Sequence, residues 1–141
     1  TTLFRSQEIE NEIIDEFSVF TDWMDKYEYI IELGKSLPMI DPQQKTEENL
    51  IKGCQSRVWL SSEYRDGKLW FAADSDAIIT KGIISLLVRV FNGHAPEDIL
   101  KSDFGFVEQI GLKDNLSPTR ANGLVSMIKQ IQSYALVYSR K

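Results

Sequence analysis

The chain has 141 residues, a hydrophobic fraction of 43% and a formal net charge of −5. This length and composition are typical of one globular domain with its own core, so we expect a single domain over residues 1–141. The acidic balance, without a dense Lys/Arg cluster, argues against a duplex-binding surface. No apolar run is long enough to span a bilayer. We therefore expect neither nucleic acid nor a membrane as a partner, and either a monomer or a homodimer.

The chain contains a single cysteine, Cys54. One cysteine excludes an internal disulfide framework, and it excludes any zinc or iron–sulfur site that needs several thiolates from this chain. A free thiol is typical of a reducing compartment, and the stretch T-T-L-F-R-S lacks a signal-peptide profile. We expect a cytoplasmic protein with no metal and no cofactor of its own.

Two amphipathic helices are expected near the N-terminus. The first is indicated by apolar residues at helical spacing: Ile9, Ile13, Ile14 and Phe17. The second is expected to be capped by Thr21 and to end at Gly34, with Pro38 as a further stop signal. Its core-facing residues are Trp23, Met24, Tyr27, Ile30 and Ile31. A polar connector is expected over residues 35–48.

A small antiparallel sheet is expected next. Asp66-Gly67 is a strong two-residue hairpin signal, because glycine accepts the positive φ that such a turn requires. The expected strands form a three-stranded meander over residues 49–52, 56–64 and 68–73. Pairing around the turn places Tyr64 opposite Leu69, Ser62 opposite Phe71 and Leu60 opposite Ala73, with Trp59 and Trp70 on the other face.

Three helices are expected after the sheet. The first is mostly buried, with a cap near Asp74 or Ser75, an end at Asn92-Gly93 and one polar stripe formed by Lys81, Ser85 and Arg89. A shorter helix is expected from Pro96, and a last one from Ser117-Pro118, with Ser117 as N-cap. The apolar face of the last helix carries Leu124, Met127, Ile128, Ile131, Tyr134 and Tyr138. The order of elements predicts an α+β fold, with the sheet packed against N-terminal and C-terminal helices.

Cys54 is the first candidate for chemistry. A free cysteine is often an inert core residue. Cys54, however, lies where the strand pattern breaks, after Gly53 and shortly before Ser56, so its sulfur is expected at a loop tip. His94, the only histidine, is the only candidate base for a Cys–His dyad, although nothing in the spacing brings the two together.

Two further clusters allow either a structural or a functional interpretation. Arg120 opposes the helix dipole in a first helical turn, and Gly123 is costly in a helix interior. Either Arg120 pairs with an acid and Gly123 permits close packing, or Arg120 faces the thiol loop or a partner. Asp74 and Asp76 are ordinary helix-capping acids, and a metal site there is poorly supported.

Taken together, three stretches resemble the SufE family of sulfur acceptors: I-K-G-C-Q-S-R-V-W-L, D-S-D-A-I-I-T-K-G-I-I and L-S-P-T-R-A-N-G-L-V-S-M-I. The N-terminal W-M-D-K-Y-E-Y-I-I-E-L-G-K-S-L-P is also similar to the family's opening helix. The resemblance runs from about Ile13 to the last helix and implies a SufE/NifU-like fold. Where the family often has glycine before the D-S-D-A element, this chain has Ala73.

The resemblance implies that Cys54 accepts sulfur as a persulfide from a SufS-type cysteine desulfurase, stimulates that enzyme, and passes the sulfur to an iron–sulfur scaffold of the SufBCD type. The pyridoxal phosphate belongs to the desulfurase, so this chain would be an accessory carrier and not an autonomous enzyme. The residues expected to support the thiol or bind a partner are Gly53, Gln55, Ser56, Asp74, Asp76 and Arg120. We expect Cys54 to be covered by side chains in the free protein and exposed on docking.

Two other functions are weighed against this one. A thiol hydrolase or transferase would use Cys54 and His94 on a small-molecule substrate of its own. An iron–sulfur scaffold would hold the cluster itself, which a single cysteine disfavours because such clusters need several thiolates.

Overall fold

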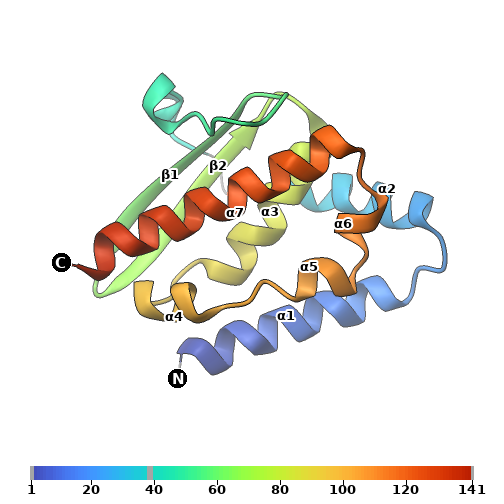
Figure 1. Ribbon diagram of the computed structural model, residues 1–141, viewed down its shortest axis with the longest axis horizontal. Helices are drawn as coiled ribbons and strands as arrows, with labels where there is room; N and C mark the ends of the chain where they lie inside the picture. Colours follow the sequence, from blue (N-terminus) through green and yellow to red (C-terminus); the bar gives the residue numbers. More distant parts are fainter. Residues whose placement is uncertain (1, 38–39, 141) are drawn as a thin grey trace.

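The computed structural model describes residues 2–37 and 40–140. Its elements, in chain order, are α1 (Thr2–Ser18), α2 (Trp23–Gly34), the short 3₁₀ helices η1 (Pro42–Gln44) and η2 (Glu47–Asn49), β1 (Val58–Arg65), β2 (Lys68–Ser75), α3 (Ile78–Phe91), α4 (Pro96–Lys101), α5 (Phe106–Gln109), α6 (Leu112–Asn115) and α7 (Pro118–Ser139). Figure 1 shows α7 running along the hairpin, α3 in the middle, and α1 on the opposite side of the molecule. The predicted α+β class is confirmed.

The hairpin has the predicted register. Tyr64 pairs with Leu69, Ser62 with Phe71 and Leu60 with Ala73. The turn residues Asp66 and Gly67 have φ of 56° and 77°, the pair of positive values that a tight hairpin turn requires. The face that carries Leu60 and Phe71 is buried, as alternation of apolar and polar residues predicts.

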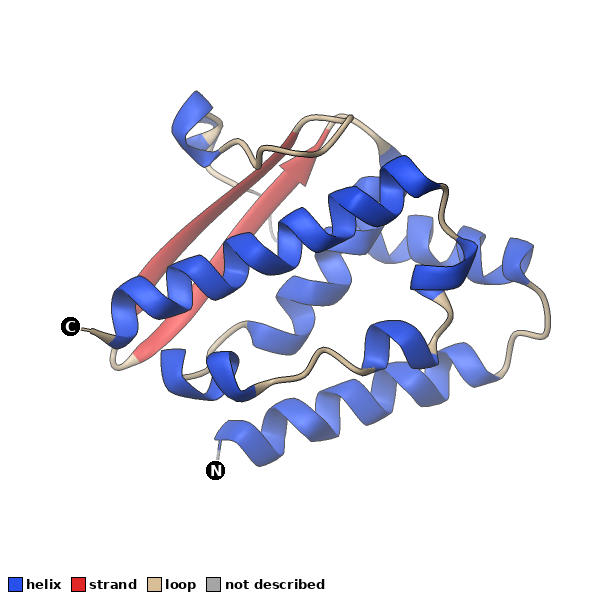
Figure 2. Cartoon of the chain, viewed as in Figure 1, coloured by secondary structure: helices blue, strands red, loops and turns tan. Residues whose placement is uncertain are grey.

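The prediction of a third strand is wrong: the sheet that the described residues form has two strands, which lie together as one hairpin in Figure 2. What remains of the third is a single bridge between Leu50 and Trp59, with the Ile51 N–H donating to Val58 O at 2.8 Å. The 3₁₀ helix η2 precedes Leu50, and the left-handed Gly53 (φ 93°) turns the chain away after Ile51. Only two residues are therefore extended beside β1.

The core forms around α3, as predicted for a nearly all-apolar helix. Its buried residues extend around most of the circumference and meet the hairpin, α2 and α7. Where α2 and α3 cross, a Cβ on Gly82 would lie 2.1 Å from Ile30 O, and a Cβ on Gly34 would lie 2.9 Å from Gly82 N. Glycine at both positions lets the two backbones touch.

The predicted helix ends are partly confirmed. α2 ends at Gly34, α3 is followed by Asn92 and Gly93 (φ 76°), and the Ser117 side chain caps α7 by accepting from the Arg120 N–H at 3.3 Å. The predicted stop at Pro38 lies outside the described residues.

Two predicted caps are wrong. The residue that caps α2 is Asp22 and not Thr21, because its carboxylate accepts from the Asp25 N–H at 2.9 Å. Asp74 and Ser75 do not cap α3, because they are the last residues of β2 and the helix begins later, at Ile78. Among the described residues, no helix combines the length and the apolar character needed to cross a membrane.

Candidate functional site

Cys54 lies in the loop between Ile51, which follows Leu50 of the bridge, and Val58, the first residue of β1. Gly53, just before it, has a left-handed backbone and packs against α7, where a Cβ would lie 2.4 Å from Ser126 Oγ. The Cys54 thiol is half-buried and donates a weak hydrogen bond to Gly123 O, with Sγ 3.6 Å from the oxygen. The close approach of Gly53 to Ser126 and the hydrogen bond to Gly123 O thus place the thiol against the N-terminal part of α7.

The thiol borders a small cavity of about 80 Å³. The cavity is lined by Cys54, Gln55, Ser56, Thr80, Ile83, Thr119, Arg120, Gly123 and Met127. These residues come from the loop and from the N-terminal turns of α3 and α7. The structure therefore brings Gln55, Ser56 and Arg120, all expected from the sequence, to one cavity with the thiol.

The cavity keeps the thiol in its neutral form. Burial raises the pKa of Cys54, because partial removal from water disfavours the charged thiolate. Arg120 is exposed and lies over the ring of Tyr27, with the guanidinium carbon 5.8 Å from the ring centre. In this conformation burial favours the protonated thiol over the thiolate.

Asp76 and Ser75 hold the far end of the Cys54 loop. Asp76 Oδ1 accepts from the Arg57 N–H at 3.0 Å, and the Asp76 N–H donates to Arg57 O at 3.2 Å. Ser75 Oγ also donates to Arg57 O, at 2.8 Å. Hydrogen bonds at Arg57 therefore hold the end of the loop to Ser75 and Asp76, and Gly53 packs against α7.

Asp74 connects three segments beside this loop. Its carboxylate pairs with Lys45 of the connector at 3.0 Å and with Lys81 of α3 at 3.4 Å. Burial alone would raise the pKa of Asp74, but the hydrogen bonds from Lys45 and the Ser75 N–H, with the charge of Lys81, outweigh it and lower the pKa. Asp74 is thus an ionised cross-link beside the site and does not line the cavity.

The structure does not bring His94 to Cys54. His94 is buried beyond the C-terminal end of α3, where Nδ1 lies 3.0 Å from Asn92 O and the backbone carbonyl accepts from the Leu69 N–H at 2.9 Å. The cavity instead meets the opposite end of α3, at Thr80 and Ile83. A helix of 14 residues separates the two places by about 20 Å.

Sequence reasoning missed part of the cavity. Thr80 and Ile83 were expected only as positions of a buried helix, and Met127 only as a core-facing residue of α7. A signal was nevertheless present, since Arg120, Gly123 and Met127 are three and four residues apart and share a helix face. No group of three or more His, Cys, Asp or Glu residues in the described chain could hold a metal ion.

Comparison with known proteins now places the chain in a family. The family described as "SufE: Fe-S metabolism associated domain" matches residues 11–135. The chain belongs to the SufE family. The matched region contains the Cys54 loop, the cavity and all but the last residues of α7. This membership confirms the resemblance in the sequence and connects the protein with iron–sulfur metabolism.

Relatives of similar length support the SufE assignment. An uncharacterised SufE-like protein of Rhizobium etli is 40% identical over 132 residues, which cover 90% of this chain and 89% of the relative. Another from Rhizobium meliloti is 40% identical over 130 residues, covering 89% of this chain and 93% of the relative. A third, from Synechocystis, is 34% identical over 126 residues, covering 89% and 79%.

A solved structure shares the fold seen here. The solution structure of a hypothetical protein from Thermus thermophilus superimposes with a TM-score of 0.78. The aligned part covers 94% of this chain and 97% of the other, at 19% sequence identity. At this identity the likeness supports the fold alone.

Proposed function

We propose that this SufE-family protein carries sulfur as a persulfide on Cys54 between a SufS-type cysteine desulfurase and an iron–sulfur scaffold of the SufBCD type. The observation that carries the proposal is the half-buried Cys54 thiol in a loop, beside a cavity of about 80 Å³. One water molecule takes about 30 Å³ in the liquid, so the cavity has room for one added sulfur atom. A carrier needs such a place to keep a reactive sulfur from stray thiols.

The loading step is a thiol exchange that needs no oxidant. The Cys54 thiolate attacks the outer sulfur of the donor's cysteine persulfide, a new S–S bond forms, and the donor's thiolate leaves with the bonding electrons. The proton of Cys54 passes to a base of the donor or to solvent. Because burial raises the pKa of Cys54, we expect docking to bring the thiol out of this environment before it reacts.

The desulfurase supplies the rest of the chemistry. Pyridoxal phosphate, bound to that partner, would release sulfur from free cysteine, and this chain would act in the cytoplasm as an accessory protein without autonomous activity. Removing sulfur from the donor's cysteine frees it for the next cycle, which accounts for stimulation of the desulfurase. The cavity mouth, where Gln55, Ser56 and Arg120 lie, is the surface proposed to meet the desulfurase.

The remaining residues of the proposed site position the Cys54 loop. Gly53 supplies the bend that places Cys54, and Asp76 fastens the loop at Arg57. Asp74 holds the connector and α3 together next to it through Lys45 and Lys81. These roles are positional, so variants at Asp74 or Asp76 should alter loading efficiency without abolishing it.

The test is incubation with a cysteine desulfurase and cysteine, followed by intact-mass measurement. Loading adds the mass of one or more sulfur atoms to the unmodified protein and adds nothing to Cys54→Ser. Desulfurase turnover should rise with the unmodified protein only. An unchanged mass in the unmodified protein, with an active desulfurase present, would overturn the proposal.

A further inference from the structure

The cavity beside Cys54 has one polar side chain on its buried wall. The lining residues that reach solvent, fully or in part, are Gln55, Ser56, Thr119 and Arg120. The buried lining residues are Thr80, Ile83, Gly123 and Met127. Of these four described residues, only Thr80, which is 7% exposed, has a polar side chain. Its hydroxyl is therefore the side-chain donor of the buried wall.

The Thr80 hydroxyl has no partner within the protein. A threonine in a helix commonly donates to the carbonyl three or four residues earlier, which here belongs to Ala77 or Asp76. No such bond forms, and the hydroxyl makes no hydrogen bond to any residue that the structure describes. A nearly buried hydroxyl without a partner costs free energy. Because Thr80 lines the cavity, the partner available to it is an atom held there.

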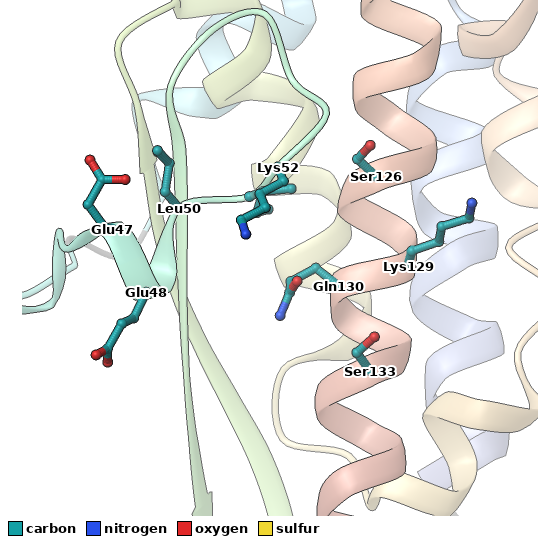
Figure 3. Close-up of a pocket in the computed structure, with 9 residues that line it drawn as sticks. Glu47, Glu48, Leu50, Lys52, Ser126, Lys129, Gln130 and Ser133 are labelled. Atoms are coloured by element: carbon teal, nitrogen blue, oxygen red, sulfur yellow. The ribbon is translucent and has the colours of Figure 1, made fainter.

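A larger groove next to the loop does not reach Cys54. This open groove of about 650 Å³ lies between α7 and the segment that leads into the loop (Figure 3). Lys52 and Ser126 lie on its opposite walls, but Cys54 does not line it. Cys54 borders the small cavity instead. A sulfur atom added to Cys54 Sγ, at a bond length of about 2.05 Å, therefore extends into the cavity.

The cavity is small enough to bring that sulfur atom to its walls. Its volume is about 80 Å³, against about 30 Å³ for one water molecule in the liquid. An atom held in so small a space contacts the residues around it, and Thr80 supplies the donor on the buried side. Sulfur accepts a hydrogen bond weakly as a neutral group and more strongly as an anion.

The N-terminal end of α3 favours the same occupant. Its N-cap residue, Ala77, makes no side-chain hydrogen bond to the N–H groups of the first turn. The partial positive charge at a helix N-terminus stabilises an anion or an electron-rich acceptor nearby. Because Thr80 belongs to this first turn, the hydroxyl and the helix end act on the same sulfur atom.

We infer that the Thr80 hydroxyl donates a hydrogen bond to the outer sulfur of the Cys54 persulfide and holds it in the cavity between loading and hand-off. The inference rests on the proposed function and assigns the group that binds the carried sulfur. The unloaded thiol does not use this hydroxyl, because Cys54 Sγ donates to Gly123 O at 3.6 Å. Thr80 should therefore affect the loaded protein and not the unloaded one.

The test compares Thr80→Val, which keeps the shape of the side chain and removes the donor, with Thr80→Ser, which keeps the donor. Thr119→Val makes the same chemical change at an exposed residue of the same cavity. Each protein is loaded by a cysteine desulfurase with cysteine, separated from both, and mixed with glutathione. The glutathione thiolate takes the outer sulfur and Cys54 leaves as a thiolate, so the decay of the added mass gives the rate of sulfur loss. Alkylation of the unloaded proteins by iodoacetamide is measured in parallel.

We expect Thr80→Val to lose sulfur about twofold to tenfold faster than the unmodified protein, which is the effect of one lost hydrogen bond. Thr80→Ser and Thr119→Val should lose sulfur at the unmodified rate. Alkylation of the unloaded thiol should be equal in all four proteins.

Equal rates of sulfur loss in Thr80→Val and the unmodified protein would overturn the inference while leaving the proposed function intact. The same acceleration in Thr80→Ser, a loading defect in Thr80→Val, or faster alkylation of its unloaded thiol would show a packing effect and would also overturn it. Failure to load the unmodified protein would instead overturn the proposed function itself.

Discussion

At the scale of single residues, Gly53 combines two constraints. Its φ of 93° is strained for any residue with a side chain, and a Cβ there would lie 2.4 Å from Ser126 Oγ. We expect Gly53→Ala to reduce the free energy of unfolding by about 1–3 kcal/mol, measured by chemical denaturation. It should also shift Cys54 out of its cavity.

Ser126→Ala provides the control for this prediction. Removing the hydroxyl leaves Ser126 Cβ 3.4 Å from the added methyl group, which is an ordinary contact. The double variant should therefore be more stable than Gly53→Ala, with the strain of the positive φ still present. If the effects of Gly53→Ala and Ser126→Ala on the free energy of unfolding simply add in the double variant, the Ser126 hydroxyl is not what excludes a side chain at position 53.

The buried position of Cys54 predicts its reactivity as a thiol. Because burial raises its pKa and shields the sulfur, the rate of alkylation by iodoacetamide at neutral pH should be lower than in the urea-unfolded chain. The rate should rise as pH increases past the ordinary thiol range. A folded protein that reacts as fast as the unfolded one would contradict the half-buried geometry.

The sequence could identify Cys54 but not most of its surroundings. A single cysteine after a glycine, outside the strand pattern, was visible in the local sequence. Its cavity is built by α3 and α7, whose residues Thr80 and Gly123 are far away along the chain. Contacts of that range depend on tertiary packing, so periodicity placed these residues in helices and could not place them at the thiol.

At the scale of elements, Glu16 of α1 joins α2 and α3. Its carboxylate accepts hydrogen bonds from Arg89, with Nη1 3.0 Å from Oε1, and from the Tyr29 hydroxyl. The hydrogen bonds from Arg89 lower the pKa of Glu16, whereas burial and the bond to Glu16 raise the pKa of Tyr29 to about 12. The Arg89 and Glu16 side chains remain 35% and 31% exposed, so screening limits the contribution of their ion pair.

Tyr29→Phe should lower the free energy of unfolding by about 1 kcal/mol at neutral pH, because one hydrogen bond is lost. The Tyr29 pKa is higher in the folded than in the unfolded chain, so its stabilisation is present below pH 10.0 and is lost as pH rises toward about 12. Denaturation curves of both proteins across this range should therefore converge. Parallel pH profiles would contradict the assigned bond.

The same cluster of Glu16, Tyr29 and Arg89 predicts how the free energy of unfolding falls at acid pH. The folded pKa of Glu16 lies below its ordinary value of 4.5, so the stabilisation is present above that pH and is lost as pH falls through the lowered pKa. Glu16→Gln should remove this part of the acid sensitivity, measured from denaturation midpoints. If Glu16→Gln loses stability at acid pH as the unmodified protein does, Glu16 does not contribute to that loss.

Prediction of elements from the sequence succeeded where the signal was local. The Asp66-Gly67 turn fixed the hairpin register, and Ser117-Pro118 marked the start of α7, because both depend on a few adjacent residues. The third strand and the cap at Asp74 failed for a tertiary reason. Lys45 and Lys81 bind Asp74 within the end of β2, and Gly53 turns the chain away from β1 after two extended residues.

At the scale of the whole molecule, the packing of α3 and α7 positions the Cys54 loop beside a small cavity. Residues of the loop, of α3 and of α7 line this cavity together with the half-buried thiol. This arrangement is compatible with the proposed role of Cys54 as a sulfur carrier. It also agrees with membership of a family associated with iron–sulfur metabolism.

The most direct test of this account is to locate the transferred sulfur within the chain. Trypsin cleaves after Lys52 and Arg57, so Cys54 is released in the short peptide G-C-Q-S-R. After incubation with a desulfurase and cysteine, and alkylation of the product, we expect this peptide to carry one additional sulfur atom that a reductant removes. An unmodified Gly53–Arg57 peptide from a reaction in which the desulfurase consumed cysteine would contradict the claim that Cys54 carries sulfur.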